Sequence, residues 1–221
     1  MANASTTGFG LRAVMTVGNT PATSGQSEYH IQTAPGVASN KGDPMSFNDG
    51  GATAGEAGMV QDASFTVTDD GGNGGTAWTT ANSALLLGVF NGAFFIDATG
   101  KPTFANNIVA GQTTSADYNT GSDDITAFII DNPNQEYVVK ADAALAQTLL
   151  GVNPMQGFNT NNYTATANLS GQSITTLDVG SAATTAMFTA VRSANDPENR
   201  DKTVAGSNWV VVAAPASALF N

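Results

Sequence analysis

The sequence contains no cysteine, and only 11% of its 221 residues are charged. The lack of cysteine excludes disulfide bonds, thiolate nucleophiles and cysteine-based zinc sites. The charged fraction is less than half of the roughly 25% that soluble domains carry. A surface built from threonine, serine and asparagine instead is polar without being strongly hydrated, which favours a protein that lies against a partner.

Positive charge is also scarce. Eighteen acidic residues stand against seven basic ones, which gives a net charge of −11. The lysines and arginines are scattered singly, except for two near residue 200. Binding phosphate requires clustered lysine and arginine, so we expect neither nucleic acid nor an anionic membrane as a partner.

Long hydrophobic runs are missing as well. The longest, Leu85–Ile96, is interrupted by Gly88, Asn91 and Gly92 and is too short to cross a bilayer. The start, Met1–Leu11, lacks the basic residues and apolar run of a secretory signal. We therefore expect a soluble protein that is made in a cytoplasm.

Glycine, threonine, asparagine and serine are abundant, and this composition disfavours helices and favours turns and short strands. From Ala63 onward, short apolar or alternating runs recur about every ten residues, which predicts a sandwich or barrel. The dipeptide Asn91–Gly92 predicts a hairpin turn between two of these strands. The predicted strands are 63–68, 85–90, 93–96, 104–109, 125–130, 136–140, 163–169, 172–177, 186–191 and 209–213.

A single helix is predicted at Ala141–Leu150, where Leu145 and Leu149 are four residues apart and Gly151 follows as a C-terminal cap. The predicted fold class is therefore all-β, with one β-barrel or jelly-roll-like β-sandwich domain and one short helix.

The first 58 residues show almost no hydrophobic periodicity. Two short strands are predicted there, at Leu11–Val17 and Glu28–Gln32, and proline and glycine interrupt the rest. This segment has too little apolar area to fold alone. We therefore predict an extended N-terminal arm with loops over residues 1–58, and a β core over residues 59–221.

The sequence offers little for catalysis. His30 is the only histidine, and the GxSxG pattern of a serine nucleophile is absent. Carboxylates occur at Asp69–Asp70, at Asp123–Asp124, and at Asp131 and Asp142, but nothing in the sequence makes any two converge across a cleft. We expect no enzymatic activity and no cofactor.

A calcium site is the one metal site worth weighing. The loop Asp69–Gly75 could supply oxygen ligands for calcium. It departs from the repeat GGxGxD, because Gly75 stands where the aspartate belongs and the motif does not recur. No metal site is predicted, and whether this loop binds calcium stays open.

Five sequence blocks together carry a resemblance to a known family. The blocks are MANASTTGFGLR (1–12), GQSEY (25–29), LGVFNGAFFIDATGKPTFAN (87–106), ITAFIIDNPNQEYVVKADAALAQTLL (125–150) and VRSANDPENRD (191–201). They resemble a family of virion structural proteins from tailed bacteriophages of cyanobacteria and other aquatic bacteria. The similarity covers residues 1 to about 201 and is weakest over residues 40–80.

Members of this family are capsid decoration, or cement, proteins. The resemblance implies a protein that is made in the host cytoplasm and lies on the outer surface of the capsid. It would bind the major capsid protein at capsomer junctions and stabilise the particle. A dimer or trimer would match a local symmetry axis of the shell.

The arm supplies the predicted partner-binding residues, which are Phe9, Leu11, Arg12, Val14 and Tyr29. On this hypothesis, deletion of residues 1–20 abolishes capsid binding and leaves the β core folded. The alternative is that these side chains pack against the protein's own core.

Two other functions were weighed. A carbohydrate-binding or adhesin-type β module on the virion surface would use exposed aromatic side chains, and the candidates are Trp78, Tyr118, Tyr163 and Trp209. A hydrolase on a β scaffold would need a converging acidic pair. A subunit of the shell itself is disfavoured, because no long spine helix is predicted.

Overall fold

The chain is almost entirely β-structured in the computed structural model. The residues described are 8–16, 20–21, 25–31, 35, 38–47, 60–62, 86–116, 125–146, 150, 157–161, 171–183, 188–195, 199 and 209–213, and they contain no helix. The all-β prediction is confirmed. The strands are β1 (Arg12–Thr16), β2 (Thr20–Pro21), β3 (Gln26–Ile31), β4 (Ser39–Asn40), β5 (Pro44–Phe47), β6 (Val60–Asp62), β7 (Leu86–Ile96), β8 (Pro102–Ala105), β9 (Asn107–Ile108), β10 (Ile125–Ile130), β11 (Gln135–Lys140), β12 (Gly157–Asn161), β13 (Thr176–Ala183), β14 (Phe188–Ser193) and β15 (Trp209–Ala213).

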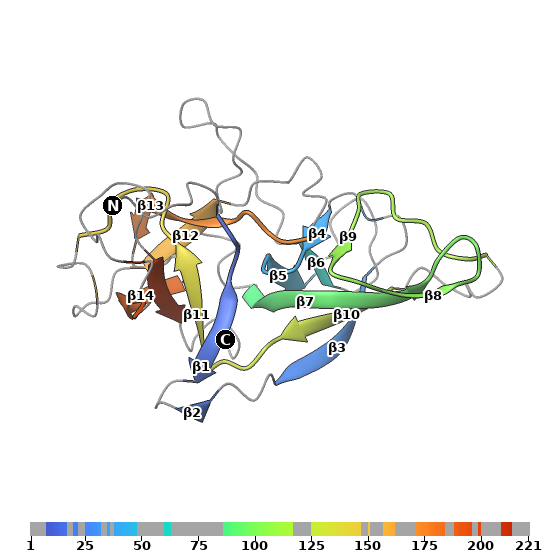
Figure 1. The fold of residues 1–221 in the computed structure, drawn as a ribbon, viewed down its shortest axis with the longest axis horizontal. Helices are drawn as coiled ribbons and strands as arrows, with labels where there is room; N and C mark the ends of the chain where they lie inside the picture. Colours follow the sequence, from blue (N-terminus) through green and yellow to red (C-terminus); the bar gives the residue numbers. More distant parts are fainter. Residues whose placement is uncertain are drawn as a thin grey trace.

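Two larger antiparallel sheets make up the fold (Figure 1). The seven-stranded sheet has the order β13-β12-β14-β15-β11-β1-β2. The six-stranded sheet has the order β3-β10-β7-β5-β6, with β8 paired to one end of β7. Its outer strands β3 and β6 approach each other without pairing, so the sheet curls but stays open. The described strands close no barrel, and the barrel form of the prediction is therefore not confirmed.

Each large sheet contributes to a hydrophobic core through the two-residue period of its strands. In the first core, Tyr137 and Val139 of β11 pack with strand β15 and with Leu86 and Val89 of β7, so this core joins the two sheets. The second core lies on the other face of β7 and contains Phe90. Burying one such side chain stabilises the fold by about 1.5–3 kcal/mol.

Strand β7 replaces the hairpin predicted at Asn91–Gly92. It runs without a break from Leu86 to Ile96. The register with β10 shifts here, because Phe128 pairs with Gly92 while Ile129 pairs with Phe90. Asn91 is thus the extra residue of a β-bulge, and Gly92 takes a φ of +140°. The predicted hairpin is therefore wrong, because pairing with β10 continues on both sides of the bulge.

The expected separation of an N-terminal arm is not confirmed. Strand β1 lies between β11 and β2, and strand β3 pairs along its full length with β10. Leu11, Ile31 and Met45 are buried in the two cores. Residues 8–47, where described, therefore belong to the same β fold as the rest of the chain. Sequence periodicity missed this because each strand contributes only one or two core side chains.

The predicted helix at Ala141–Leu150 is absent over residues 141–146, and residues 147–149 lie outside the described part. Ala141 instead forms a bridge to Leu177, and the Asp142 amide donates to the Leu177 carbonyl oxygen at 3.0 Å. Leu145 is buried in the first core. Pairing with β13 thus overrides the helical propensity of this alanine-rich segment. In the described residues, no helix has the length and hydrophobicity to span a membrane.

Segment 40–43 ties the sheets together around a buried carboxylate. Asp43 is only 2% exposed. Its Oδ2 accepts from the Asn40 amide at 2.7 Å, and its Oδ1 accepts from the Thr175 hydroxyl at 3.0 Å. Burial raises the pKa of Asp43, and the hydrogen bonds that it accepts oppose this shift.

Gly88 is the position in β7 where a side chain is least tolerated. A Cβ there would overlap the carbonyl oxygen of Ile130 and lie 2.9 Å from Ile129 Cγ2. We predict that Gly88→Ala lowers the free energy of unfolding by about 1–3 kcal/mol, because backbone must move. Urea unfolding measures the change. Gly25→Ala is the control, since its nearest contact is 3.9 Å away, and equal losses in both variants would contradict the packing argument.

The raised pKa of Asp43 predicts a pH dependence of stability. The folded chain holds the Asp43 proton more tightly than the unfolded chain. The stability that Asp43 contributes through this proton is complete below about pH 4, the ordinary carboxyl range. It is lost as the pH rises through the raised pKa. As the pH rises from 4 to 8, the free energy of unfolding of Asp43→Asn should therefore increase relative to that of the wild type. Chemical unfolding across that range measures it.

Asp97→Asn is the control. Hydrogen bonds from Thr99 and the Lys101 amide lower the pKa of Asp97, so its contribution to stability is lost only as the pH falls below about 4, the ordinary carboxyl range. The difference between Asp97→Asn and the wild type should therefore stay nearly constant from pH 4 to pH 8. A difference between Asp43→Asn and the wild type that stays constant from pH 4 to pH 8 would contradict the prediction.

Candidate functional site

A row of side chains crosses four neighbouring strands on the outer face of the seven-stranded sheet. Arg12 of β1 pairs with Val138 of β11, which pairs with Val211 of β15, which in turn pairs with Arg192 of β14. Their neighbours along the strands, such as Tyr137 and Val212, point to the opposite face and into the first core. The alternation of the strands therefore presents this row away from the core.

A hollow of about 320 Å³ lies over this row, and we call it the outer hollow. Such a volume is at the lower end of the range for ligand pockets, about 300–1,000 Å³. Four strands and two loops contribute to its lining. The described lining residues are Phe9, Arg12, Val14, Met15, Val138, Arg192, Ala194, Asn195, Trp209 and Val211.

Phe9 and Arg12 form a ridge at one side of this hollow. The Phe9 ring meets Trp209 edge-on, with 5.1 Å between ring centroids and 72° between planes. The Arg12 guanidinium carbon lies 4.4 Å from the Phe9 ring centroid. A cation–π contact of this kind stabilises an exposed pair by about 0.5–1 kcal/mol. Phe9 thus fixes the direction of the Arg12 side chain.

A second hollow, of about 290 Å³, lies on the other side of the ridge. We call it the inner hollow, because β1 and β7 both line it. Phe9 and Arg12 line it too, together with Lys41, Asn91 and Gln172. The ridge of Phe9 and Arg12 therefore separates two adjoining depressions.

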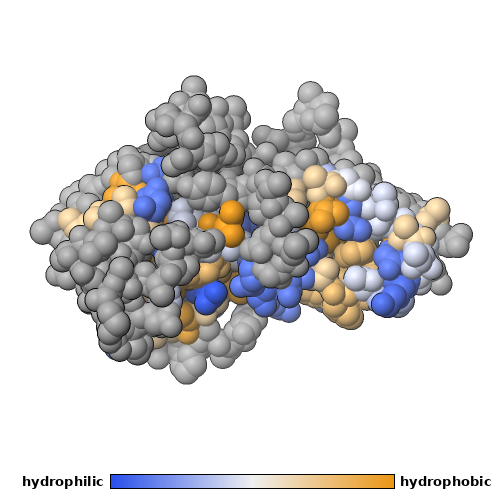
Figure 2. All heavy atoms as spheres, turned by 45° about the horizontal axis from the view of Figure 1, so that its top comes forward, coloured by the Kyte–Doolittle hydropathy of each residue, from blue (hydrophilic) through white to orange (hydrophobic). Residues whose placement is uncertain are grey.

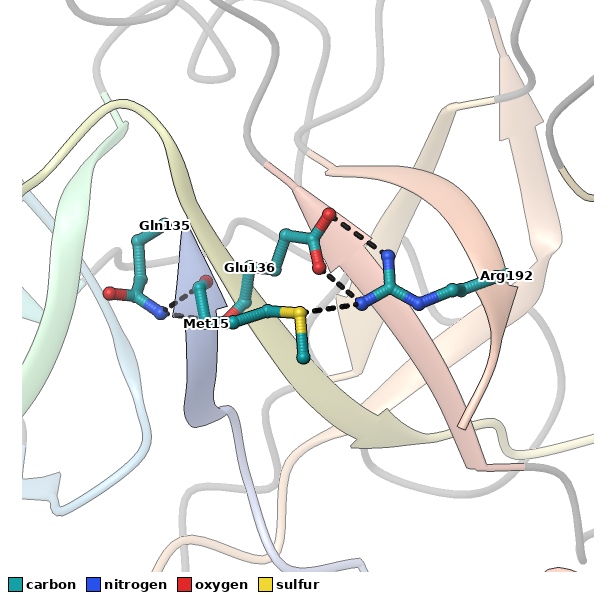
Figure 3. A network of polar contacts seen from close by, with 4 residues as sticks. All are labelled: Met15, Gln135, Glu136 and Arg192. Carbon is teal, nitrogen blue, oxygen red and sulfur yellow. Dashed lines mark hydrogen bonds and ion pairs between the residues drawn. The ribbon is translucent and has the colours of Figure 1, made fainter. Parts of the chain in front are cut away.

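Arg192, which lines the outer hollow, forms an ion pair with the nearly buried Glu136 (Figure 3). Both guanidinium Nη atoms of Arg192 donate to the carboxylate of Glu136, at 3.0 and 2.5 Å, and Nη2 also contacts the Met15 sulfur at 3.2 Å. The Glu136 side chain is 6% exposed and that of Arg192 is 40% exposed. This pairing raises the pKa of Arg192. The partly exposed Arg192 therefore lies between the Glu136 carboxylate and the solvent and balances its charge.

Gln135 continues this network toward β1. Its amide nitrogen donates to the Met15 carbonyl oxygen and to the Glu136 carbonyl oxygen, both at 2.8 Å (Figure 3). Its own side-chain oxygen is buried without a partner in the described residues. These bonds hold the bulged part of β1, between Ala13 and Met15, against β11.

The structure brings together three of the five predicted partner-binding residues. Phe9, Arg12 and Val14 line the outer hollow, and Val14 is 38% exposed. Leu11 points the other way and is 3% exposed in the first core, so for this residue the alternative of self-packing is correct. Tyr29 lies apart from the outer hollow, on β3 of the other sheet.

Tyr29 is held by its own sheet. Its hydroxyl donates to Asp131 Oδ2 at 2.7 Å. Burial and this carboxylate raise the pKa of Tyr29 to about 12. Its hydroxyl therefore joins β3 to the loop after β10 and is not part of the hollow.

The candidates for catalysis do not assemble in the described residues. His30 lies exposed on β3. Asp131 bonds with Tyr29, whereas Asp142 accepts from the Val179 amide at 3.0 Å. The described residues contain no group of three or more His, Cys, Asp or Glu side chains placed to hold a metal ion. The pairs Asp69–Asp70 and Asp123–Asp124, and the loop Asp69–Gly75, lie outside the described part.

Of the four aromatic residues weighed for sugar binding, only Trp209 is described, and it lines the outer hollow. Trp78, Tyr118 and Tyr163 lie outside the described residues. On the face drawn in Figure 2, the described hydrophobic residues form small separate areas between hydrophilic ones. That face presents no broad hydrophobic area among the described residues.

Sequence reasoning missed the residues that complete the outer hollow. Met15, Val138, Arg192 and Val211 come from strands that are up to about 200 positions apart in the chain. The strands themselves were predicted, but their order in the sheet was not. Only the pairing of β1 with β11 and of β15 with β14 places these residues in one row.

The described architecture defines an all-β protein with open antiparallel sheets and a lined depression on one sheet face. No family model, curated protein or solved structure matches the chain. The resemblance to capsid decoration proteins therefore stays a prediction.

The Glu136–Arg192 pair predicts asymmetric effects of mutation. Arg192→Met leaves a nearly buried carboxylate without its cation, and we expect a loss of about 1–3 kcal/mol in the free energy of unfolding, reduced by the exposure of Arg192. The double variant Glu136→Gln/Arg192→Met should lose less than Arg192→Met alone. Urea unfolding of the full cycle measures the coupling, and strictly additive losses would contradict it.

Proposed function

We propose that this chain is a phage capsid decoration protein. It binds the outer surface of the major capsid protein shell at capsomer junctions, stabilises the particle and catalyses no reaction. The observation that carries the proposal is the placement of Phe9, Arg12 and Val14, three residues expected to bind the shell, around one open hollow. The sequence resemblance supplies the identity of the partner.

The chemistry of the outer hollow suits a protein partner. Aromatic residues and arginine are enriched at protein–protein interfaces, and they carry a large share of the binding energy there. Here the Phe9 ring contacts both Trp209 and Arg12, which belong to two strands of one sheet. Residues held in place before binding lose little conformational entropy when a partner docks.

A capsid lattice repeats the same binding site many times. A dimer or trimer of this chain would therefore engage several sites at once and gain avidity from modest individual contacts. The low charged fraction of the sequence fits a surface that lies against a neighbouring shell. We propose the virion exterior as the location and the host cytoplasm as the place of synthesis.

A carbohydrate-binding module on the virion surface is a second candidate. Trp209 and Phe9 at the outer hollow, next to Asn195, favour it, because the apolar face of a sugar ring stacks on aromatic side chains. A glycan array tests this candidate directly. The absence of any glycan bound above background would end it.

The test of capsid decoration uses phage capsids assembled without this chain. Wild-type protein should cosediment with them to saturation. Val14→Asp should lower occupancy at least tenfold at the wild-type half-saturation concentration, because a carboxylate would be buried in the interface. Deletion of residues 1–20 does not test this contact, because it removes β1 and the core residue Leu11 from the fold.

Val109→Asp is the matched control. Val109 is 49% exposed and follows β9, away from both hollows, so its substitution should leave occupancy unchanged. Full occupancy by Val14→Asp would rule out the outer hollow as the contact. Failure of the wild-type chain to bind any capsid would rule out the proposed function.

A further inference from the structure

The two hollows concentrate positive charge on an acidic protein. Arg12, Lys41 and Arg192 line them, and these are three of the seven lysines and arginines in the sequence. None of the described lining residues of either hollow is aspartate or glutamate. The net charge of the whole chain is −11. Because Arg192 is paired with Glu136, Arg12 and Lys41 are the lining cations that can attract a negative group at the ridge.

Arg12 and Arg192 differ in how many guanidinium hydrogen-bond donors remain for a ligand. Arg192 already makes a two-pronged pair with the Glu136 carboxylate. Arg12 is exposed and takes no part in that pair. Phe9 contacts the guanidinium of Arg12 through its ring face. A guanidinium held this way can still donate from its edge to a carboxylate in two parallel hydrogen bonds.

Apolar side chains lie on both sides of Arg12. Val14, Val138 and Val211 line the outer hollow, and Ala13 and Val89 line the inner hollow. Burying apolar groups against such walls adds about 25 cal/mol per Å² removed from water. A ligand with a central negative charge could therefore gain binding energy from a small apolar side chain on each side of the ridge.

We propose that the Phe9–Arg12 ridge receives an acidic segment of the partner protein, in which an aspartate or glutamate side chain pairs with Arg12 and neighbouring apolar side chains enter the two hollows. This proposal rests on the proposed function, because it names the chemistry by which the shell protein would be recognised. Charge complementarity selects this occupant, since a second copy of so acidic a chain would meet overall repulsion.

The first experiment uses two dipeptides as probes, N-acetyl-Leu-Glu-amide and N-acetyl-Leu-Gln-amide, titrated into the full chain and followed by NMR. The glutamate probe should bind at least fivefold more tightly at low ionic strength, and added salt should reduce the preference. Backbone amide shifts should centre on Arg12–Val14 and Trp209–Val211. Equal affinity of the two probes would overturn the proposal.

The second experiment assigns the preference to single cations. Arg12→Gln should abolish the discrimination between the probes, and Arg12→Lys should keep part of it, because lysine retains the charge but not the planar fork. Lys41→Gln should weaken it by a smaller factor. Lys101→Gln is the control, since Lys101 is exposed at the turn before β8 and should change nothing. Discrimination that survives Arg12→Gln would overturn the proposal.

The capsid assay separates this inference from the proposed function. If Arg12→Gln and Lys41→Gln decorate capsids like the wild type, the acidic segment is not the recognised feature and the inference fails, while capsid decoration stands. If wild-type protein binds no capsid but still prefers the glutamate probe, the proposed function fails and the carboxylate site at the ridge is supported. Unfolding midpoints equal to the wild type exclude misfolding of the variants.

Discussion

The buried carboxylate of Asp43 and the backbone of segment 40–43 hold the two sheets in their places. The Gly42 amide donates to the Phe90 carbonyl oxygen at 2.8 Å. The Phe90 amide donates in turn to the backbone carbonyl oxygen of Asp43 at 2.9 Å. The Gly42 carbonyl oxygen accepts from the Leu11 amide at 2.9 Å. Gly42 has a φ of +101°, a conformation that glycine alone adopts readily. A single short segment thus joins β7 to the start of β1.

The hydrogen bonds of segment 40–43 also determine which side chains face the outer hollow. Because Leu11 is bonded to Gly42 and buried in the first core, the next residue, Arg12, must point to the opposite face. Pairing with β11 then sets Arg12 beside Val138. The position of Arg12 in the ridge is therefore an outcome of core packing on the other side of the same strand.

Part of the local structure could be predicted from the sequence, and two of the failures share one cause. Strands β10 and β15 were predicted with their correct bounds, and β11 to within one residue, because their apolar residues mark them clearly. The hairpin at Asn91–Gly92 and the helix at Ala141–Leu150 were predicted from local signals. In both places a distant strand supplied the deciding hydrogen bonds, from β10 to β7 and from the start of β13 to Ala141.

The sequence by itself determined the all-β class and the acidic, cysteine-free character of the chain. Composition and two-residue periodicity are enough for these, because they depend on each residue and its near neighbours. Tertiary structure alone decided that Leu11 is core and that Arg192 and Val211 join Arg12 in one row. Strand order and register depend on contacts between residues far apart in the chain, and no local pattern encodes them.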